Sequence, residues 1–79
     1  MSDPALVLEI DAAGEEALVE MRGQQRRLSV ALLTLEGTPV APGDWVLASA
    51  GMAVERMDES DAKELAALIA QARDQEDRP

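Results

Sequence analysis

The chain contains no cysteine, no histidine, no phenylalanine and no tyrosine. The missing cysteine excludes disulfides, zinc–thiolate sites and a thiol nucleophile. The missing histidine removes the commonest metal ligand and the side chain that most readily titrates near neutral pH. Any metal site would therefore be built from carboxylates and would favour hard cations. We predict no cofactor and no metal site.

Positive charge is also scarce, with seven Lys and Arg residues against sixteen Asp and Glu residues and a net charge of −9. Such a chain is repelled by phosphate backbones and by anionic membrane surfaces. Its single aromatic residue provides no platform on which bases could stack. No apolar run approaches the ~18–20 residues that span a membrane, and the N-terminus lacks the basic region of a secretory signal. These absences predict a cytoplasmic protein that binds neither nucleic acid nor membrane and acts by contact with another protein.

The length of 79 residues predicts one domain, 1–79, without a cleft between domains. Short apolar runs rich in β-forming residues, separated by turn residues, predict five strands. They lie at residues 5–10, 17–21, 26–31, 44–49 and 51–57. The run 26–35 is ambiguous, because its Ala-Leu-Leu end also suits a short helical turn. Residues 36–43 hold two Pro and two Gly and are expected to form a loop.

Alternation assigns faces to the last two strands. In 44–49, Trp45 and Leu47 oppose Val46 and Ala48, and we expect the only Trp to fill the core, with an interface anchor as the alternative. In 51–57 the pattern sets Met52, Val54 and Arg56 against Ala53, Glu55 and Met57. This last strand either pairs with 44–49 through a very tight turn or continues it across a kink at the glycine between them.

The C-terminal part predicts a helix over about 59–73. Asp58 suits the N-cap, and acidic residues in the first turn suit the helix dipole. An apolar stripe follows the i, i+3, i+4, i+7 spacing through Ala62, Leu65, Ala66, Ile69 and Ala72, with Leu68 widening it. The tail 74–79 is acidic and is expected to fray. A small barrel over about 4–57, with this helix packed on it, is the predicted architecture.

Few residues suggest chemistry. Asp58, Glu59 and Asp61 lack the alternating donors of an EF-hand loop and are interpreted as a capped helix start. The serines have no histidine to activate them, and nothing supports a pairing with Lys63, so no catalytic residue is predicted and the chain is not expected to be an enzyme. The basic run 25–27 is either an exposed strand face or a contact for an acidic partner.

Residues 7–11, 17–33 and 42–64 resemble the HypC/HupF family of nickel–iron hydrogenase maturation chaperones. The matching motifs are a strand ending in Glu-Ile-Asp, then Gly-x-x-Arg-x-Leu-x-Val, then Gly-Asp-Trp-Val-Leu, and finally Glu-Arg-Met-Asp-Glu. They lie at residues 9–11, 23–30, 43–47 and 55–59. The resemblance implies a mainly β fold, a small OB-like five-stranded β-barrel with a C-terminal α-helix. It also implies work with HypD, in which the pair carries an iron–cyanide–carbonyl fragment to the precursor of the hydrogenase large subunit.

The chain departs from the family pattern at two positions where family members have potential iron ligands. Family members begin Met-Cys-(Leu/Ile)-Gly-x-Pro; aligned through Pro4, this chain starts after the Cys position, and aligned from Met1, Ser2 occupies it. The family's Val-Leu-Val-His-x-Gly becomes Val-Leu-Ala-Ser-Ala-Gly, with Ser49 in place of the His. A serine hydroxyl is a weak ligand that does not bind iron as thiolate or imidazole would.

We therefore predict an accessory protein of hydrogenase maturation that contacts a large-subunit precursor or a HypD-type partner without carrying iron itself. By resemblance, the partner-binding residues are Pro4, Ser49, Gly51 and Met52. The alternative is a HypC-like barrel repurposed as a small subunit or regulator of another assembly. A third possibility is a longer native N-terminus with a Met-Cys start, which would restore an iron-carrying role.

Overall fold

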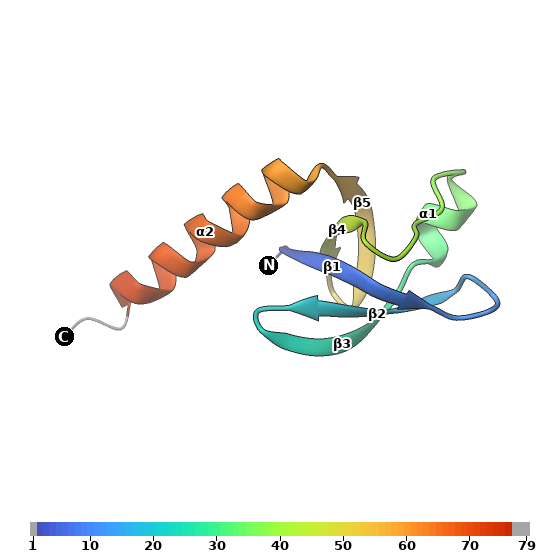
Figure 1. Ribbon diagram of the computed structural model, residues 1–79, viewed down its shortest axis with the longest axis horizontal. Helices are drawn as coiled ribbons and strands as arrows, with labels where there is room; N and C mark the ends of the chain where they lie inside the picture. Colours follow the sequence, from blue (N-terminus) through green and yellow to red (C-terminus); the bar gives the residue numbers. More distant parts are fainter. Residues whose placement is uncertain (1, 77–79) are drawn as a thin grey trace.

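Five strands close into a barrel, and one long helix packs against its outside (Figure 1). The computed structural model describes residues 2–76. The elements are β1 (Asp3–Ile10), β2 (Glu16–Met21), β3 (Gln24–Ser29), α1 (Ala31–Leu35), β4 (Trp45–Ser49), β5 (Met52–Met57) and α2 (Glu59–Glu76). Around the barrel the strand order is β1-β2-β3-β5-β4, with β4 returning to β1. All pairs are antiparallel except β3 with β5. The predicted OB-like barrel with a C-terminal helix is confirmed.

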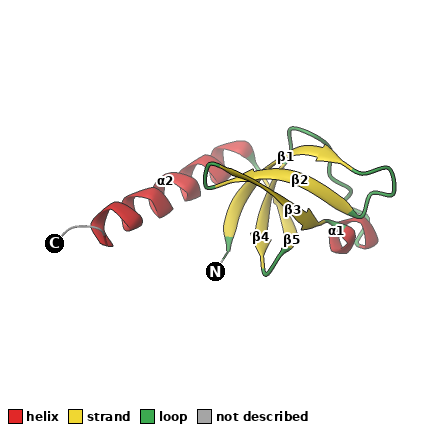
Figure 2. Cartoon of the chain, turned by 90° about the horizontal axis from the view of Figure 1, so that it is seen from below, coloured by secondary structure: helices red, strands yellow, loops and turns green. Residues whose placement is uncertain are grey.

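The ambiguous run after the third strand contains a helix. β3 ends at Ser29 and α1 begins at Ala31, so the prediction of a strand over 26–31 was wrong at its end. The Val30 N–H donates to the Glu15 carbonyl (2.8 Å), and the Val30 carbonyl then accepts from the Thr34 N–H (3.1 Å), which starts a helical turn. Buried Val30 and Leu33 fix α1 at the end of the barrel near the β1–β2 loop (Figure 2). At the other end of the chain, α2 continues to Glu76, past the expected end near 73, and residues 77–79 lie outside the described part.

Two bulges set which side chains face the core. In β1 the register steps from Val7↔Val19 to Glu9↔Leu18, so one extra residue in β1 lets both Val7 and Ile10 pack inward. In β5 the register passes from Leu47↔Glu55 to Ala48↔Ala53.

The β5 bulge falls at Val54 and overturns the simple alternation predicted for 51–57. Met52 lies opposite Ser49, and Met57 lies opposite Trp45, so both share the outer face with Glu55. A bulge adds one residue to one strand only, which flips every later side chain to the other face. No sequence feature at Val54 marked this change.

The barrel interior is narrow and filled by small side chains. The four largest fully buried side chains are all valines, at positions 7, 19, 30 and 46, and much of the remaining core is alanine. Five strands enclose little space, and β-branched or smaller residues fill it without strain. An indole does not fit, so the expectation that Trp45 fills the core was wrong: Trp45 is half-buried and lies outside the core cluster.

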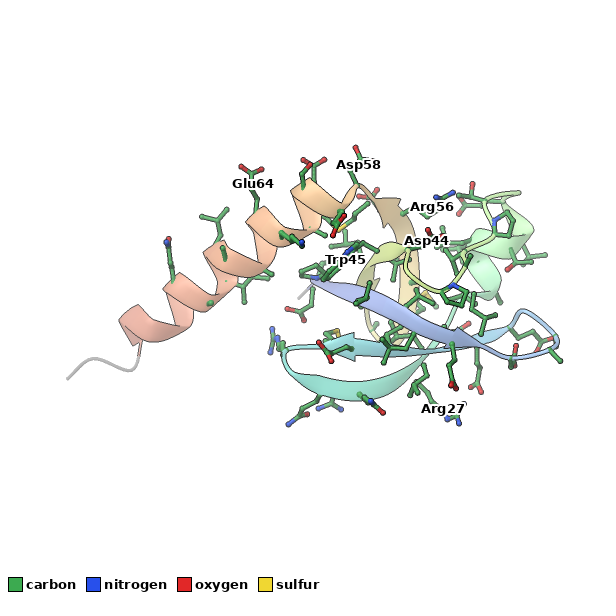
Figure 3. The ribbon with its side chains drawn as sticks, in the orientation of Figure 1. Arg27, Asp44, Trp45, Arg56, Asp58 and Glu64 are labelled. Carbon is green, nitrogen blue, oxygen red and sulfur yellow. The ribbon has the colours of Figure 1, made fainter. Side chains whose placement is uncertain are left out.

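Trp45 instead belongs to a second apolar layer between the barrel and α2. On the outer face, β1 and β4 pair Pro4 with Leu47 and Leu6 with Trp45, and α2 contacts these same two strands. Ala62 of α2 is fully buried there, and Figure 3 shows Trp45 on the side of the barrel where α2 begins. Farther along, α2 projects away from the barrel (Figure 1), and Leu68 is 61% exposed. In the described part of the chain, no helix is long and apolar enough to cross a membrane.

Candidate partner-binding site at the barrel mouth

Two tight hairpin turns border one hollow of the barrel. The β2–β3 turn passes through Arg22 and Gly23, with φ of 55° and 75°, and the β4–β5 turn through Ala50 and Gly51, with φ of 54° and 80°. Positive φ at both central residues is the requirement of a type I′ turn, whose twist matches that of the flanking strands. Of the two options for 51–57, the structure therefore has the tight turn and not the kink. Both turns place their backbones at the same rim.

Between the two turns lies a hollow of about 740 Å³, which we call the barrel mouth. It is lined by Asp3, residues 21 and 22, residues 24–28 and residues 48–51. Its floor is apolar and its rim is polar. Arg26 pairs across the ladder with buried Val19, so its side chain starts on the inner face of the sheet, where its Nη2 donates to Gln24 Oε1 (2.9 Å). The mouth thus combines an apolar base with donors held above it.

An ion pair ties the first strand to the β2–β3 turn. Arg22 Nε and Nη2 both donate to Asp3 Oδ1, at 3.0 Å and 2.8 Å. Asp3 is only 9% exposed, because it sits on the inner side of β1 beside Ala48. A buried carboxylate needs such a partner to offset its lost hydration. The pair fixes the position of the turn relative to the start of the chain.

Three of the four residues predicted to bind a partner lie together. Ser49 and Gly51 line the mouth, and Met52, paired with Ser49 across the turn, is 40% exposed beside them. Pro4 lies elsewhere: it is buried and lines a smaller hollow of about 270 Å³ against Ala66 and Ile69 of α2. The structure therefore gathers the β4–β5 corner at the mouth and places Pro4 under the helix.

The donor chemistry of this corner is oxygen only. Asp3↔Ala48 is the last pair of the β1–β4 ladder, and exposed Ser2 and Ser49 each lie one residue beyond it along their own segment. Two neutral hydroxyls are weak ligands and carry no negative charge at neutral pH. Among residues 2–76, no three acidic side chains gather closely enough to hold a metal ion, which includes the carboxylates at the start of α2. These residues do not fit an iron-carrying site.

Sequence reasoning missed two residues of the mouth. Arg22 had a local signal, since it precedes Gly23 between two strands, but its partner Asp3 lies 19 residues earlier, and nothing in the sequence joins the two. For the basic run 25–27 the sequence suggested either an exposed strand face or a contact for an acidic partner, and in the structure this run borders the mouth. Arg27 itself points away from the barrel (Figure 3).

The fold defines a class of protein, a small OB-like β-barrel with a C-terminal helix. The family model described as HupF/HypC family matches residues 1–69. The chain belongs to the HupF/HypC family, as its motifs predicted. No curated protein matches it significantly. Members of this family are chaperones in hydrogenase maturation, which assigns the chain to that process.

Proposed function

We propose that this protein assists hydrogenase maturation by direct contact with a large-subunit precursor or a HypD-type partner, and that it does not itself carry iron. The contact surface is the barrel mouth together with exposed Met52. The observation that carries the proposal is that this family barrel has Ser49 at the β4–β5 corner, where the family motif has a histidine, with Ser2 one residue beyond the last pair of the β1–β4 ladder. The scaffold is retained, while the two positions that the family resemblance links to iron hold only hydroxyls.

The ladder also supports one of the two alignments left open by the sequence. If Ser2 occupies the family's Cys position, it lies one residue beyond the Asp3↔Ala48 pair, as does Ser49, the residue in the family's His position. This proximity supports the alignment from Met1.

The mouth suits protein contact on physical grounds. Its floor is apolar and its rim carries Arg22, Arg26 and glutamine side chains, a mixture typical of transient interfaces. Met52 adds a flexible, polarizable side chain at the edge. Pro4 remains part of the prediction through its neighbours Ser2 and Asp3, since Pro4 itself is covered by α2.

Co-purification from the native host tests the proposal. A tagged wild-type chain is expected to recover the large-subunit precursor or HypD, with no stoichiometric iron on the chain alone. Met52→Asp should reduce recovery, because it places a charge at the contact surface. Leu35→Asp is the matched control: Leu35 is 85% exposed on α1 and does not line the mouth, and its variant should recover the partner normally. Recovery of neither partner by wild type would refute the proposal and favour the repurposed barrel.

A restoration variant tests the iron claim separately. Ser2→Cys combined with Ser49→His returns a thiolate and an imidazole to the two positions one residue beyond the β1–β4 ladder. Co-expressed with its partner, this double variant is expected to retain iron with cyanide and carbonyl vibrations, whereas wild type is not. Wild type that carries the same vibrations would contradict the claim.

A further inference from the structure

The outer edge of β3 is open where it borders the barrel mouth. β3 pairs with β2 along its whole length, from Glu16↔Ser29 to Met21↔Gln24. On its other side, the only pair within the described residues is Ser29↔Met52, at the far end of the strand. β5 begins at Met52 and runs parallel to β3, away from the β2–β3 turn, so residues 24–28 of β3 have no β5 residue beside them. The mouth lies between these residues and residues 48–51.

The ladder fixes which backbone groups face that gap. In an antiparallel pair, alternate residues direct both N–H and C=O toward the partner strand, and the residues between them direct both groups away. The Val30 N–H bonds to Glu15 on the β2 side (2.8 Å), and the Ser29 N–H bonds to Gly51 on the other side (3.1 Å). Counting back by twos from Ser29, Arg27 and Gln25 turn their N–H and C=O into the gap.

Two consecutive sets of backbone donors and acceptors therefore stand unpaired beside a hollow. Such an edge is a template for an added strand, and natural proteins normally cover or shorten it. The side chains of β3 from Gln24 to Arg27 are polar and exposed. The open edge therefore stays in contact with water when no partner is bound.

The charged side chains beside this edge indicate which kind of added strand would bind there. Two of the seven basic residues of the chain, Arg26 and Arg27, lie on this edge in a protein of net charge −9, while neighbouring Arg22 is ion-paired with Asp3. Arg26 starts on the inner face and Arg27 on the outer face, so an added strand would meet positive charge on both of its faces. A second copy of this chain pairing through the same edge would bring like charges together, which is unfavourable.

We propose that β3 accepts an extended, acidic segment of a partner protein as an added strand, hydrogen-bonded to the backbone of Gln25 and Arg27. Main-chain bonds supply the affinity of this mode of recognition, and the arginines select carboxylate side chains. The inference deepens the proposed function and rests on it for the identity of the partner.

Amide exchange of labelled protein, observed by NMR, tests the pairing directly. In the free protein the amides of Gln25 and Arg27 should exchange fast, while those of Arg26 and Leu28, bonded to β2, should exchange slowly. The probe is a set of overlapping peptides that cover the large-subunit precursor and HypD. Acidic peptides should bind and protect Gln25 and Arg27 while leaving Arg26 and Leu28 unchanged.

Variants separate the contribution of the backbone N–H to peptide binding from that of the arginine side chains. Gln25→Pro removes an N–H that is directed away from β2, and it should weaken peptide binding about three- to tenfold. Gln25→Ala keeps that N–H and should bind within about twofold of wild type. Replacing Arg26 and Arg27 together by Gln should weaken binding and flatten its dependence on salt. Slow exchange of the amides at positions 26 and 28 in each variant checks that the hairpin is intact.

The outcomes separate this inference from the proposed function. If whole partners co-purify with wild type but no acidic peptide protects Gln25 and Arg27, strand addition is wrong and the proposed function stands. If acidic peptides bind as expected while neither whole partner is recovered, the proposed function is wrong and strand addition stands. Protection of Gln25 and Arg27 that rises with protein concentration alone would show a second copy at this edge and overturn the inference.

Discussion

β1 and β3 both belong to one closed sheet, yet they are built in opposite ways. β1 is paired along both edges, with β2 and β4, and most of its residues are buried or half-buried. β3 is paired along one edge, and only Leu28 among its six residues is buried. The sequences show the same contrast, DPALVLEI against QQRRLS. A strand of a small barrel can thus lie mostly in the core or leave one edge unpaired, depending on how many of its residues pair with the neighbouring strand.

A charge placed in each strand gives the largest expected difference. Val7→Asp buries an unpaired carboxylate in the core and should cost more than about 4 kcal/mol, enough to unfold the chain. Gln25→Asp leaves the carboxylate in water, with Glu20 opposite it as the only added repulsion, and should cost less than about 1 kcal/mol. Urea unfolding followed by circular dichroism measures both. Comparable losses would mean that β3 is as much a part of the core as β1.

The ion pair between Asp3 and Arg22 links the two regions and should have the next largest effect. Asp3→Asn removes the charge that accepts both guanidinium bonds and is expected to cost about 1–2 kcal/mol, since the pair is only partly buried. A double-mutant cycle with Arg22→Gln isolates the coupling between the two side chains. A coupling energy near zero would show that the pair does not hold the turn.

Replacing the glycine of either hairpin turn by alanine should lower the free energy of unfolding by a similar amount. Gly23 and Gly51 have similar positive φ, and an added Cβ meets nothing within 4 Å at either position, so only backbone strain opposes alanine. Gly23→Ala and Gly51→Ala should each lower the free energy of unfolding by about 1 kcal/mol. Ala50→Asn should raise it by a few tenths, because Asn tolerates positive φ. A much smaller loss at Gly23 would show that the β2–β3 tip opens without unfolding the barrel.

The smallest effect is a pH dependence at the end of β1. The Glu15 N–H donates to Asp11 Oδ1 (2.9 Å), and this bond lowers the pKa of the Asp11 carboxyl below its usual value. Because the folded-state pKa is the lower one, the stabilisation is present above the ordinary carboxyl pKa and is lost as pH falls through the lowered value. Asp11→Asn should therefore be less stable than wild type at neutral pH, with the difference shrinking in acid. Glu64→Gln, on exposed α2, is the control that should show no such trend.

The candidate site was only partly predictable. Ser49, Gly51 and Met52 were predicted together because they are close in the chain and belong to one family motif; Ser49 and Gly51 line the mouth, and Met52 pairs with Ser49 beside it. Pro4 was assigned with them by resemblance, but Pro4 is on the outer face of β1, where α2 covers it. Side-chain direction depends on register, and a shift of one residue decides between mouth and helix.

The five strands, α2, the charge and the family were all predicted from the sequence, whereas α1 was only an alternative for the end of the third strand. Turn residues and apolar runs marked five strands, helical spacing marked α2, and the absence of cysteine and histidine excluded soft metal ligands. Only the tertiary structure decided the bulge at Val54, the outward position of Trp45, the pairing of Asp3 with Arg22 and the open edge of β3. Each of these depends on which residues lie opposite one another when the sheet closes, and local sequence does not encode that register.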